Sequence, residues 1–429
     1  MVGSGLASPT QTCRIASVSE GVVMRQVLAV VGTRSEMVRL APVIRRLRNE
    51  GGRAVTVRWI QVGDDAEQIW QTGAIFGLSP DHEIALNYGP GPANLLEHSW
   101  ALTNAISKEI ECCPPDLLVV QGESLPAMLA AQQAFMRRVP VIYLATPSYC
   151  GLRQTNGKKN SYRKLLNAIS TFQCVANEED LMQLRERGVP AFEIGITGDT
   201  VVDAIDTVTR HGVLNGGKAV HDSVDGLVST RILVLLGAES RWVGSLTDLA
   251  LAIADLAHSL SDVEFTVVLE PGAAYRDLLT AILGSTLNVA IRESMPYPEF
   301  LRLLQQHDFV LADSLDYYDE AVALSKPTLL AEDPIPGQDF VQPPGLIFAG
   351  QRRDQIVRAV MALRQGRRQA IDPITDPLSA INSLGDGHAA SRITRLILNW
   401  SRNQILTPRA FEPFRSRQAF QGRAITEVA

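Results

Sequence analysis

The sequence predicts an α/β protein with two Rossmann-like αβα domains that face each other across a cleft. Apolar runs rich in β-branched residues alternate with amphipathic segments along most of the chain, a pattern typical of parallel sheets covered by helices. A stretch rich in Gly, His, Asp and Ser at about 210–229 interrupts this alternation and indicates a linker. A chain of 429 residues is long enough for two domains with cores of ordinary size.

The composition excludes several classes of protein. Hydrophobic residues make up 46% of the chain and charged residues 20%, as in soluble globular proteins. The net charge of −6 does not indicate a nucleic-acid partner or an anionic membrane surface. No apolar run approaches the roughly 18 residues that span a bilayer, and the five cysteines show neither a disulfide framework nor metal-ligand spacing. We therefore expect a cytoplasmic protein without a membrane span, a metal or a cofactor.

The first domain is predicted over residues 25–209. Residues 1–23 are mostly small and polar and lack the features of a signal peptide, so we expect 1–24 to be a disordered extension. The expected strands lie near Val27–Val31, Val55–Val62, Asp116–Val120, Val139–Leu144, Phe172–Val175 and Phe192–Ile196. The expected helices lie near Glu36–Asn49, Asp65–Phe76, Ala93–Glu109, Glu178–Arg187 and Thr200–Val208.

A second domain is predicted over 230–384, after the linker at 210–229. Its expected strands lie near Ile232–Leu236, Glu264–Leu269, Leu287–Ile291, Phe309–Ala312 and Pro327–Leu330, with helices between them. The run Gly385-Asp386-Gly387-His388 opens a further helix, predicted over 385–403. The remaining residues, 404–429, carry four arginines without apolar periodicity, so we expect a flexible tail and not a nucleic-acid-binding arm.

Arg34 lies where the first predicted strand passes into the first predicted helix. Gly32 and Thr33 form a tight turn after the strand, and Ser35 is a suitable N-cap for the helix. In open α/β sheets, ligands bind at the carboxyl edge of the strands. The positive end of the helix dipole and the guanidinium would together favour an anion such as a phosphate. The alternative is an ordinary strand-to-helix turn whose arginine faces solvent.

Several short segments occur in an order and spacing typical of one enzyme family. The first are Gly32-Thr-Arg-Ser-Glu36 and Arg39-Leu-Ala-Pro42, followed by Leu78–Asp81, Pro115–Gly122, Ile196–Asp203, Leu311–Ser314, Asp319–Ala321, Ser325–Pro327 and Asn382–Gly387. Together they resemble the non-hydrolysing UDP-N-acetylglucosamine 2-epimerases, whose opening segment is G-T-R-P-E-x-x-K-x-A-P. The resemblance covers about residues 25–400 and implies a two-domain GT-B fold with UDP bound between the domains. It also implies a last helix that crosses back to the first domain, and a homodimer.

The resemblance implies nucleotide-binding roles for individual residues. Arg34 matches the family arginine near the nucleotide phosphates, and Arg39 replaces the family lysine with the charge kept. Phe300 matches the ring that stacks on uracil, although a helix core residue is the alternative interpretation. Ser314 matches a serine at a helix N-terminus that holds phosphate, where the helix dipole would assist. Glu320 matches the acid that binds the ribose hydroxyls.

The catalytic part of the family pattern is largely absent. The family uses carboxylates and a histidine to eliminate UDP and to add it back from the other face of the sugar. Its Glu in H-V-E-A-G-L-R is replaced by Ala145, and its His in G-H-R-R-E is missing from Gly237–Ser240. Its acid pair in P-E-E-x-N-R is replaced at Lys158-Lys159-Asn160, and Leu315-Asp316 replace a glycine pair that follows the phosphate serine. The carboxylate of H-G-D survives, one methylene longer, as Glu123. Each acid–base residue contributes about two to four orders of magnitude to the rate, so losing three or more would remove that mechanism.

Three functions remain open. The first is a UDP-sugar-dependent, glycosyltransferase-like enzyme, of the kind used in polysaccharide biosynthesis, which needs a base near the acceptor and help for the departing UDP. The second is a non-catalytic UDP-sugar-binding relative, and the third is a 2-epimerase with rearranged acids. Retention of the nucleotide-binding residues together with loss of the acids favours the first two. Candidate bases on the predicted strand-end loops are Glu123, Asp65 and Glu239, with Asp64 and Glu67 beside them; the alternative for each is a solvated loop acid.

Overall fold

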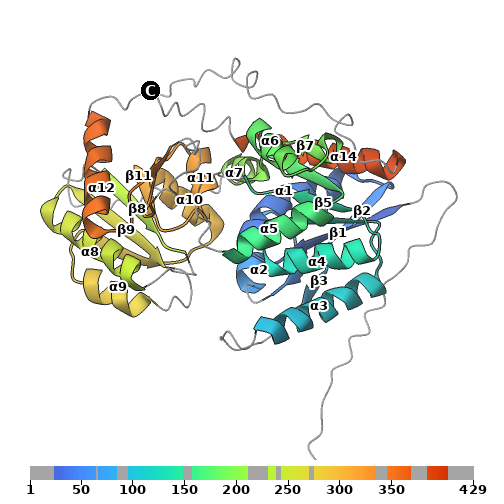
Figure 1. Ribbon diagram of the computed structural model, residues 1–429, viewed down its shortest axis with the longest axis horizontal. Helices are drawn as coiled ribbons and strands as arrows, with labels where there is room; N and C mark the ends of the chain where they lie inside the picture. Colours follow the sequence, from blue (N-terminus) through green and yellow to red (C-terminus); the bar gives the residue numbers. More distant parts are fainter. Residues whose placement is uncertain are drawn as a thin grey trace, which may run out of the picture.

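The computed structural model describes residues 24–63, 66–84, 95–147, 157–210, 230–237, 243–269, 275–333, 345–368 and 384–403. These residues form two lobes that lie side by side, each with a parallel β-sheet between helices (Figure 1). Residues 1–23 of the predicted extension, residues 211–229 of the predicted linker and the predicted tail lie outside the described residues. The predicted domain boundaries therefore stay predictions, while the two-domain α/β architecture is confirmed.

The first lobe is built on a seven-stranded parallel sheet with the order β3-β2-β1-β4-β5-β6-β7. The strands are β1 (Arg25–Val31), β2 (Val55–Val62), β3 (His82–Ile84), β4 (Leu117–Gln121), β5 (Val141–Leu144), β6 (Phe172–Val175) and β7 (Ile194–Ile196). Connections leave β1 and β4 in opposite directions, which makes the space between their carboxyl ends a topological switch point, where such sheets bind ligands. No sequence pattern predicts the edge strand β3, because three residues carry too little periodicity.

Helices cover both faces of the first sheet. They are α1 (Arg34–Glu50), α2 (Ala66–Ile75), α3 (Leu95–Cys112), α4 (Leu125–Met136), α5 (Gly157–Ile169), α6 (Glu178–Glu186) and α7 (Thr200–Arg210), with a 3-10 turn at Ala191–Glu193. Helices α1, α2 and α7 share a core with Val27 and Ala29 of β1, whereas α3, α4 and α5 belong to the core on the other face with Leu28 and Val30. Because β1 is buried on both faces, its sequence is an unbroken apolar run.

Thr33 caps α1, and the prediction of Ser35 as the N-cap is wrong. The Thr33 hydroxyl accepts the N–H of Glu36 at 3.2 Å, and the Thr33 backbone is extended, as a cap requires. The Glu36 carboxylate in turn accepts the N–H of Gly32 at 2.6 Å. A threonine and a glutamate three residues later thus satisfy donors at the helix start in the manner of a capping box. Ser35 lies inside the first turn, and α1 begins directly after Thr33.

The second lobe has the same type of architecture, built on a six-stranded parallel sheet in the order β10-β9-β8-β11-β12-β13. The strands are β8 (Thr230–Leu235), β9 (Val263–Leu269), β10 (Val289–Glu293), β11 (Phe309–Ala312), β12 (Thr328–Leu330) and β13 (Leu346–Phe348), and the helices are α8 (Val243–Ser259), α9 (Arg276–Leu283), α10 (Tyr297–Gln306), α11 (Tyr318–Ala323) and α12 (Arg353–Arg368). Helices α8, α9 and α12 cover one face, and α10 and α11 cover the other. The switch point of this sheet lies between β8 and β11. The short edge strand β13 is again not predicted.

One cluster of buried apolar side chains joins the two lobes. It contains residues of α1 and α7 from the first lobe together with residues of α10 and α11 from the second. Those elements lie where the lobes meet (Figure 1). The lobes therefore share part of their core and present the carboxyl edges of both sheets to the junction.

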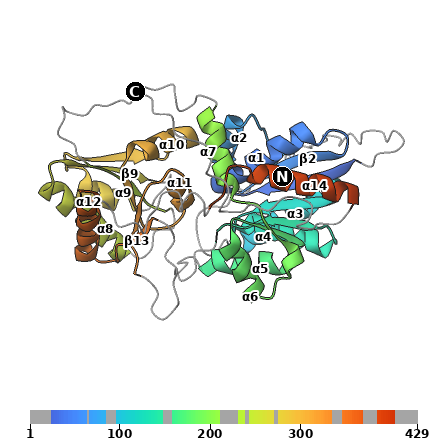
Figure 2. The same cartoon turned by 90° about the horizontal axis from the view of Figure 1, so that it is seen from above.

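The last helix, α14 (Ala389–Asn403), crosses back to the first lobe and lies beside α1 (Figure 2), as the family resemblance implies. Its first two N–H groups each donate to the carboxylate of Asp203 on α7 at 3.1 Å. The chain enters this helix in backbone contact with the turn before α7, where the Asp199 N–H donates to the Leu384 carbonyl at 2.6 Å. A Cβ at Gly385 would lie 3.0 Å from the Cα of Gly198, and Gly385 has φ +128°, so only glycine fits there.

Candidate functional site

The candidate site residues lie at the carboxyl ends of strands at both switch points. Arg34 follows β1, and Glu123 follows β4 in the first lobe. In the second lobe, Gly237 follows β8 and the loop at 313–317 follows β11. The Gly237 N–H donates to Asp313 at 2.8 Å, which joins the two strand ends of that switch point. A crevice between two such edges is where this kind of sheet binds its ligands.

Arg34 extends from the start of α1 into the second lobe. Its Cζ lies 5.9 Å from the ring centroid of Phe300 and 5.6 Å from that of Tyr317, within the range of cation–π contacts. Nη1 donates to the carbonyl of Met295 at 3.2 Å, and Nη2 donates to the Tyr317 hydroxyl at 3.4 Å. The alternative of a solvent-facing arginine is therefore wrong. The structure places Arg34 over two aromatic rings, and its contact with a phosphate stays a prediction.

A small cavity of about 10 Å³ lies beside these contacts. Its lining residues are Arg34, Leu235, Leu236, Val268, Ser294, Met295, Phe300 and Tyr317. This volume holds about one water molecule. Phe300 is 2% exposed and belongs to the shared apolar cluster, so the core interpretation of Phe300 holds. Stacking of a base on its ring stays a prediction, and it requires the Arg34 side chain to move aside.

Glu320 is a buried carboxylate with an unsatisfied acceptor. It is 3% exposed, and its Oε2 has no hydrogen-bond partner within the described chain. The hydroxyl of Tyr297 on α10 is also buried and unpartnered among these residues. Burial raises the pKa of Glu320, and burial together with the Glu320 charge raises the pKa of Tyr297. An unsatisfied buried polar group costs about 1–3 kcal/mol, so both groups are suited to the hydroxyls of a ligand.

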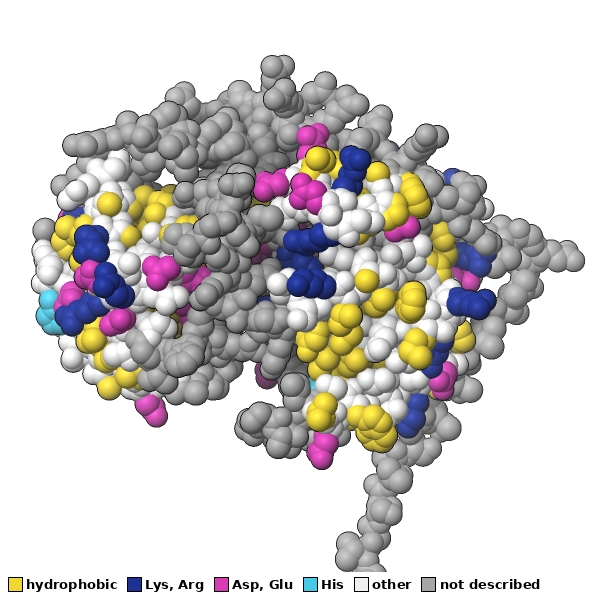
Figure 3. Space-filling view, viewed as in Figure 1, with side chains coloured by type: hydrophobic (Ala, Val, Ile, Leu, Met, Phe, Trp, Pro, Cys, Tyr) yellow, Lys and Arg dark blue, Asp and Glu magenta, His cyan; other side chains and the backbone are white. Residues whose placement is uncertain are grey.

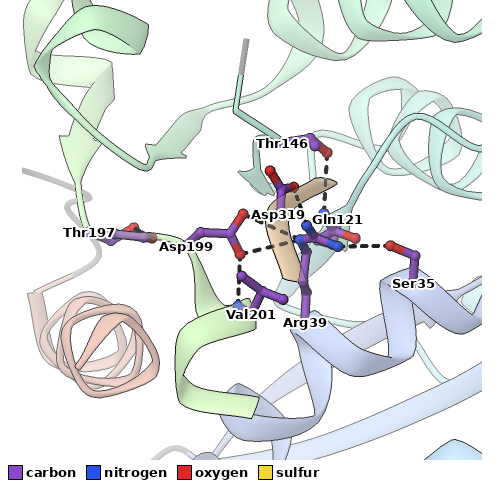
Figure 4. Close-up of polar contacts among 9 residues, drawn as sticks. Ser35, Arg39, Gln121, Thr146, Thr197, Asp199, Val201 and Asp319 are labelled. Carbon is purple, nitrogen blue, oxygen red and sulfur yellow. Dashed lines mark hydrogen bonds and ion pairs between the residues drawn. The ribbon is translucent and has the colours of Figure 1, made fainter. Parts of the chain in front are cut away.

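Arg39 forms a buried ion cluster that joins the lobes (Figure 4). Its Nε donates to Asp199 at 3.2 Å, its Nη1 donates to Ser35 at 2.8 Å, and its Nη2 is paired with Asp319 on α11 of the second lobe. Arg39 is 3% exposed. Burial acts to lower its pKa, but the two aspartates outweigh burial and raise it above the ordinary value. All three guanidinium nitrogens bind protein groups, so this geometry fits an interlobe link better than the predicted nucleotide contact.

Ser314 lies in the loop before α11, and its prediction as a helix N-terminal residue is wrong. Helix α11 begins only at Tyr318. The Ser314 hydroxyl donates to Oδ2 of Asp316 at 3.2 Å. Oδ1 of Asp316 accepts a hydrogen bond from Lys159 on α5 of the first lobe at 2.8 Å. A phosphate contact at Ser314 therefore depends on its hydroxyl and on nearby cations, and not on the dipole of α11.

Glu123 forms a buried ion pair at the edge of the first sheet. Its carboxylate accepts from Arg163 of α5 at 2.7 Å and 2.8 Å, and the Tyr143 hydroxyl donates to it at 3.4 Å. The side chains of Glu123 and Arg163 are 9% and 7% exposed. A general base has to be free to accept a proton from a ligand. The role of Glu123 as a base stays a prediction, and its geometry is that of a structural ion pair.

Glu36 lies against Glu123 on the same edge. A Cβ at Gly122 would lie 3.1 Å from the Glu36 carboxylate, so the residue before Glu123 is packed against this carboxyl group. Burial raises the pKa of Glu36 to about 7. Hydrogen bonds from Ser124 and Gly32 act to lower this pKa, and the charge of Glu123 acts to raise it further. Two acids thus meet here, and one of them is held largely protonated below neutral pH.

Of the other predicted acids, only Glu67 lies within the described residues. Asp64, Asp65 and Glu239 lie outside the described residues, so their roles stay predictions. Glu67 is exposed on α2, where it accepts a hydrogen bond from Gln71 at 3.1 Å, as expected of a solvated acid.

Sequence reasoning missed three residues of the crevice. Tyr317 follows Ser314 closely, and an aromatic residue in a strand-end loop would have indicated it. Arg163 is the arginine at the end of the altered P-E-E-x-N-R segment, and Lys159 stands at an altered acid in the same segment. The described part of the chain has no group of three or more His, Cys, Asp or Glu side chains placed to bind a metal ion. None of its helices combines the length and apolarity needed to cross a membrane.

Two parallel sheets of this order, in lobes that share part of their core, define a two-domain α/β protein of GT-B type. The family model described as UDP-N-acetylglucosamine 2-epimerase matches residues 53–398. A probable UDP-N-acetylglucosamine 2-epimerase of Ralstonia nicotianae is 24% identical over 379 residues, which cover 87% of this chain and 99% of the relative. The chain belongs to the UDP-N-acetylglucosamine 2-epimerase family.

Solved structures share the fold. The UDP-GlcNAc 2-epimerase of Neisseria meningitidis bound to UDP-GlcNAc is similar with a TM-score of 0.74 and 22% identity, over 87% of this chain and all (100%) of the other. The S. aureus MnaA–UDP co-structure is similar with a TM-score of 0.73 and 18% identity, over 89% of this chain and 98% of the other. At these identities the likeness establishes the fold alone.

Proposed function

We propose that this protein binds a UDP-sugar between its lobes and uses it in a glycosyltransferase-like reaction, with the sugar not epimerised at C2. The observation that carries the proposal is the buried, unsatisfied carboxylate oxygen of Glu320 on the second lobe. A protein seldom keeps such an acceptor without a partner. The proteins in the similar solved structures bind UDP-GlcNAc or UDP, whose ribose hydroxyls would supply the missing donor.

These contacts indicate where the base, the ribose and the phosphates of the nucleotide would lie along the second lobe. The base would pack on Phe300 after Arg34 withdraws, and Met295 would offer its carbonyl to a base N–H in place of the guanidinium. The ribose would lie against Glu320 and Tyr297. The phosphates would then face Ser314 at the switch point between β8 and β11.

The chemistry is inferred from the other lobe. Epimerisation at C2 needs acid–base groups free to exchange protons with the sugar. Glu123, the surviving family carboxylate, is already paired with Arg163 in a buried site. Transfer to an acceptor needs electrostatic help for the departing UDP and one base. Arg34 is the candidate for the first role, and Asp65 and Glu239 are the candidates for the second.

A non-catalytic UDP-sugar-binding protein is the second candidate function. The Glu123–Arg163 pair is also consistent with this non-catalytic function. A carboxylate held in an ion pair contributes to the structure of a binding site without acid–base chemistry. The homodimer that the family resemblance implies and a cytoplasmic location also belong to the proposal. Light scattering of the purified protein tests the first, and fractionation of cells tests the second.

Calorimetry with UDP and UDP-GlcNAc, followed by NMR of the incubated sugar in D₂O, tests the function. Binding with UDP release only when an acceptor is added supports transfer. Binding without turnover under any acceptor supports the non-catalytic function. Deuterium at C2, or a product of the ManNAc type, contradicts both and indicates an epimerase with rearranged acids. Absence of UDP binding contradicts the whole proposal.

A further inference from the structure

Two departures from the family pattern that lie far apart in the sequence form one contact. Asp316 stands where the family has a glycine beside the phosphate serine, and Lys159 stands where the family has an acid. In the structure, Lys159 Nζ donates to Asp316 Oδ1 at 2.8 Å, from α5 of the first lobe to the loop after β11 of the second. Both side chains are about half exposed, so the pair lies at the opening of the crevice and not in the core.

The Asp316 carboxylate lies at the switch point of the second sheet. Its Oδ2 accepts the Ser314 hydroxyl at 3.2 Å. A Cβ at Gly237, which follows β8, would lie 3.3 Å from Oδ2 and 3.1 Å from the Ser314 hydroxyl. One oxygen of the half-exposed carboxylate thus lies beside the ends of β8 and β11, in the place where a sheet of this kind holds a ligand.

A hydroxyl from one lobe and an ammonium from the other converge on this one anion. Carboxylates and phosphates accept the same charge-assisted hydrogen bonds, so the donors around Asp316 would equally serve a phosphate. Lys and Arg side chains gather over α5 where the first lobe meets the second (Figure 3). Lys159 and Lys164 are exposed on that helix.

We propose that Lys159 is a phosphate-binding residue of the crevice and that Asp316 occupies the phosphate position until a nucleoside diphosphate displaces it. This inference rests on the proposed binding of a UDP-sugar and adds a residue that the family pattern lacks. The Asp316 carboxylate then competes with the ligand phosphate for Ser314 and Lys159. Removing the Asp316 charge should tighten the binding of a phosphorylated ligand, while the affinity for a ligand without phosphate should not change.

Calorimetry with UDP and with uridine on the full chain tests this inference. Asp316→Asn should tighten UDP binding about tenfold, and Lys159→Gln should weaken it about tenfold, each the size of one charge-assisted hydrogen bond. Uridine affinity should stay within about twofold in both variants, because uridine reaches neither residue. Lys164→Gln on the same helix and Asp354→Asn on the exposed face of α12 are matched controls that should change neither affinity. Thermal unfolding of each variant confirms that it is folded.

The outcomes separate the two proposals. If UDP binds to the wild-type protein and neither Asp316→Asn nor Lys159→Gln changes the ratio of UDP to uridine affinity, the inference is wrong and UDP binding stands. If Asp316→Asn weakens UDP binding, Asp316 is not a competitor and the inference is wrong. If no variant binds UDP or uridine, the inference and the proposed function are both wrong.

Discussion

One acid at each of the two sheet edges that meet between the lobes differs from the other in its hydrogen bonding. On the first lobe, Oε1 of Glu123 accepts hydrogen bonds from Arg163 and Tyr143. On the second lobe, Glu320 keeps a buried oxygen that no described residue satisfies. A side chain whose partners are all internal contributes to stability, whereas a buried acceptor without a partner lowers stability unless a ligand supplies a donor. We therefore expect Glu123 to have a structural role and Glu320 to bind a ligand.

The Arg39 cluster joins the two edges, and breaking it should give the largest effect. Arg39→Ala leaves Asp199 and Asp319 buried without a cation and should lower the free energy of unfolding by about 4 kcal/mol. Urea unfolding followed by circular dichroism measures the change. Arg46→Ala, which removes an exposed i, i+4 pair with Glu50 on the same helix, should change stability by less than about 0.5 kcal/mol. Equal effects of the two variants would show that the buried cluster does not hold the lobes together.

Glu123→Ala tests whether the first edge is structural. It leaves Arg163 buried without its counter-ion and should lower the free energy of unfolding by about 3 kcal/mol. UDP affinity should change by less than about twofold, since Glu123 makes no contact with the second lobe's base and ribose residues. Glu67→Ala, an exposed acid of the same lobe, is the control. A strong loss of sugar turnover in a Glu123→Gln variant of unchanged stability would instead establish Glu123 as a catalytic base.

Glu36 makes the stability of the first edge depend on pH. Its pKa rises from 4.5 in the unfolded chain to about 7 in the folded protein. The folded state therefore holds a proton that the unfolded state releases. The contribution of Glu36 to the stability of the folded state is complete below pH 4.5 and is lost as the pH rises through 7. The loss should reach about 3 kcal/mol, at about 1.4 kcal/mol for each pH unit.

Glu36→Gln isolates this effect from all other titrations. The difference in unfolding free energy between wild type and variant, measured in urea at pH 5, 6, 7 and 8, should move in favour of the variant with each step up to about pH 7. A difference that does not depend on pH would mean that the Glu36 carboxyl is ionised in the folded protein throughout this range.

Glu320→Gln should give the smallest change and the most specific one. It should weaken UDP binding about tenfold, the cost of one hydrogen bond between a hydroxyl and a carboxylate. Stability should not fall, because burial already raises the pKa of the Glu320 carboxyl and an amide carries no charge to desolvate. Calorimetry with UDP and 2′-deoxy-UDP should show that the variant discriminates less between them. Retained discrimination would place the ribose elsewhere.

Most of the fold can be predicted from the sequence, because its signals are local. The run Val27–Val31 is apolar throughout since β1 is buried on both faces, and Val55–Val62 and Phe172–Val175 have the observed strand bounds. The short edge strands β3 and β13 cannot be found this way, since pairing with a neighbouring strand and not periodicity defines them. Thr33 and Ser35 are both suitable caps by residue type, and only the backbone geometry of the turn decides between them.

The sequence by itself determined that two αβα units stand in series and which residues stand at the ends of their strands. The family resemblance of its segments implied nucleotide-binding roles for Arg34, Phe300, Ser314 and Glu320, and these roles stay predictions. Only the tertiary structure decided which charges meet. Arg39 pairs with Asp319 and Lys159 with Asp316 across the junction of the lobes, at positions far apart in the chain. A helix or strand is specified by neighbours within a few residues, whereas an ion pair between lobes exists only once both sheets have folded and packed together.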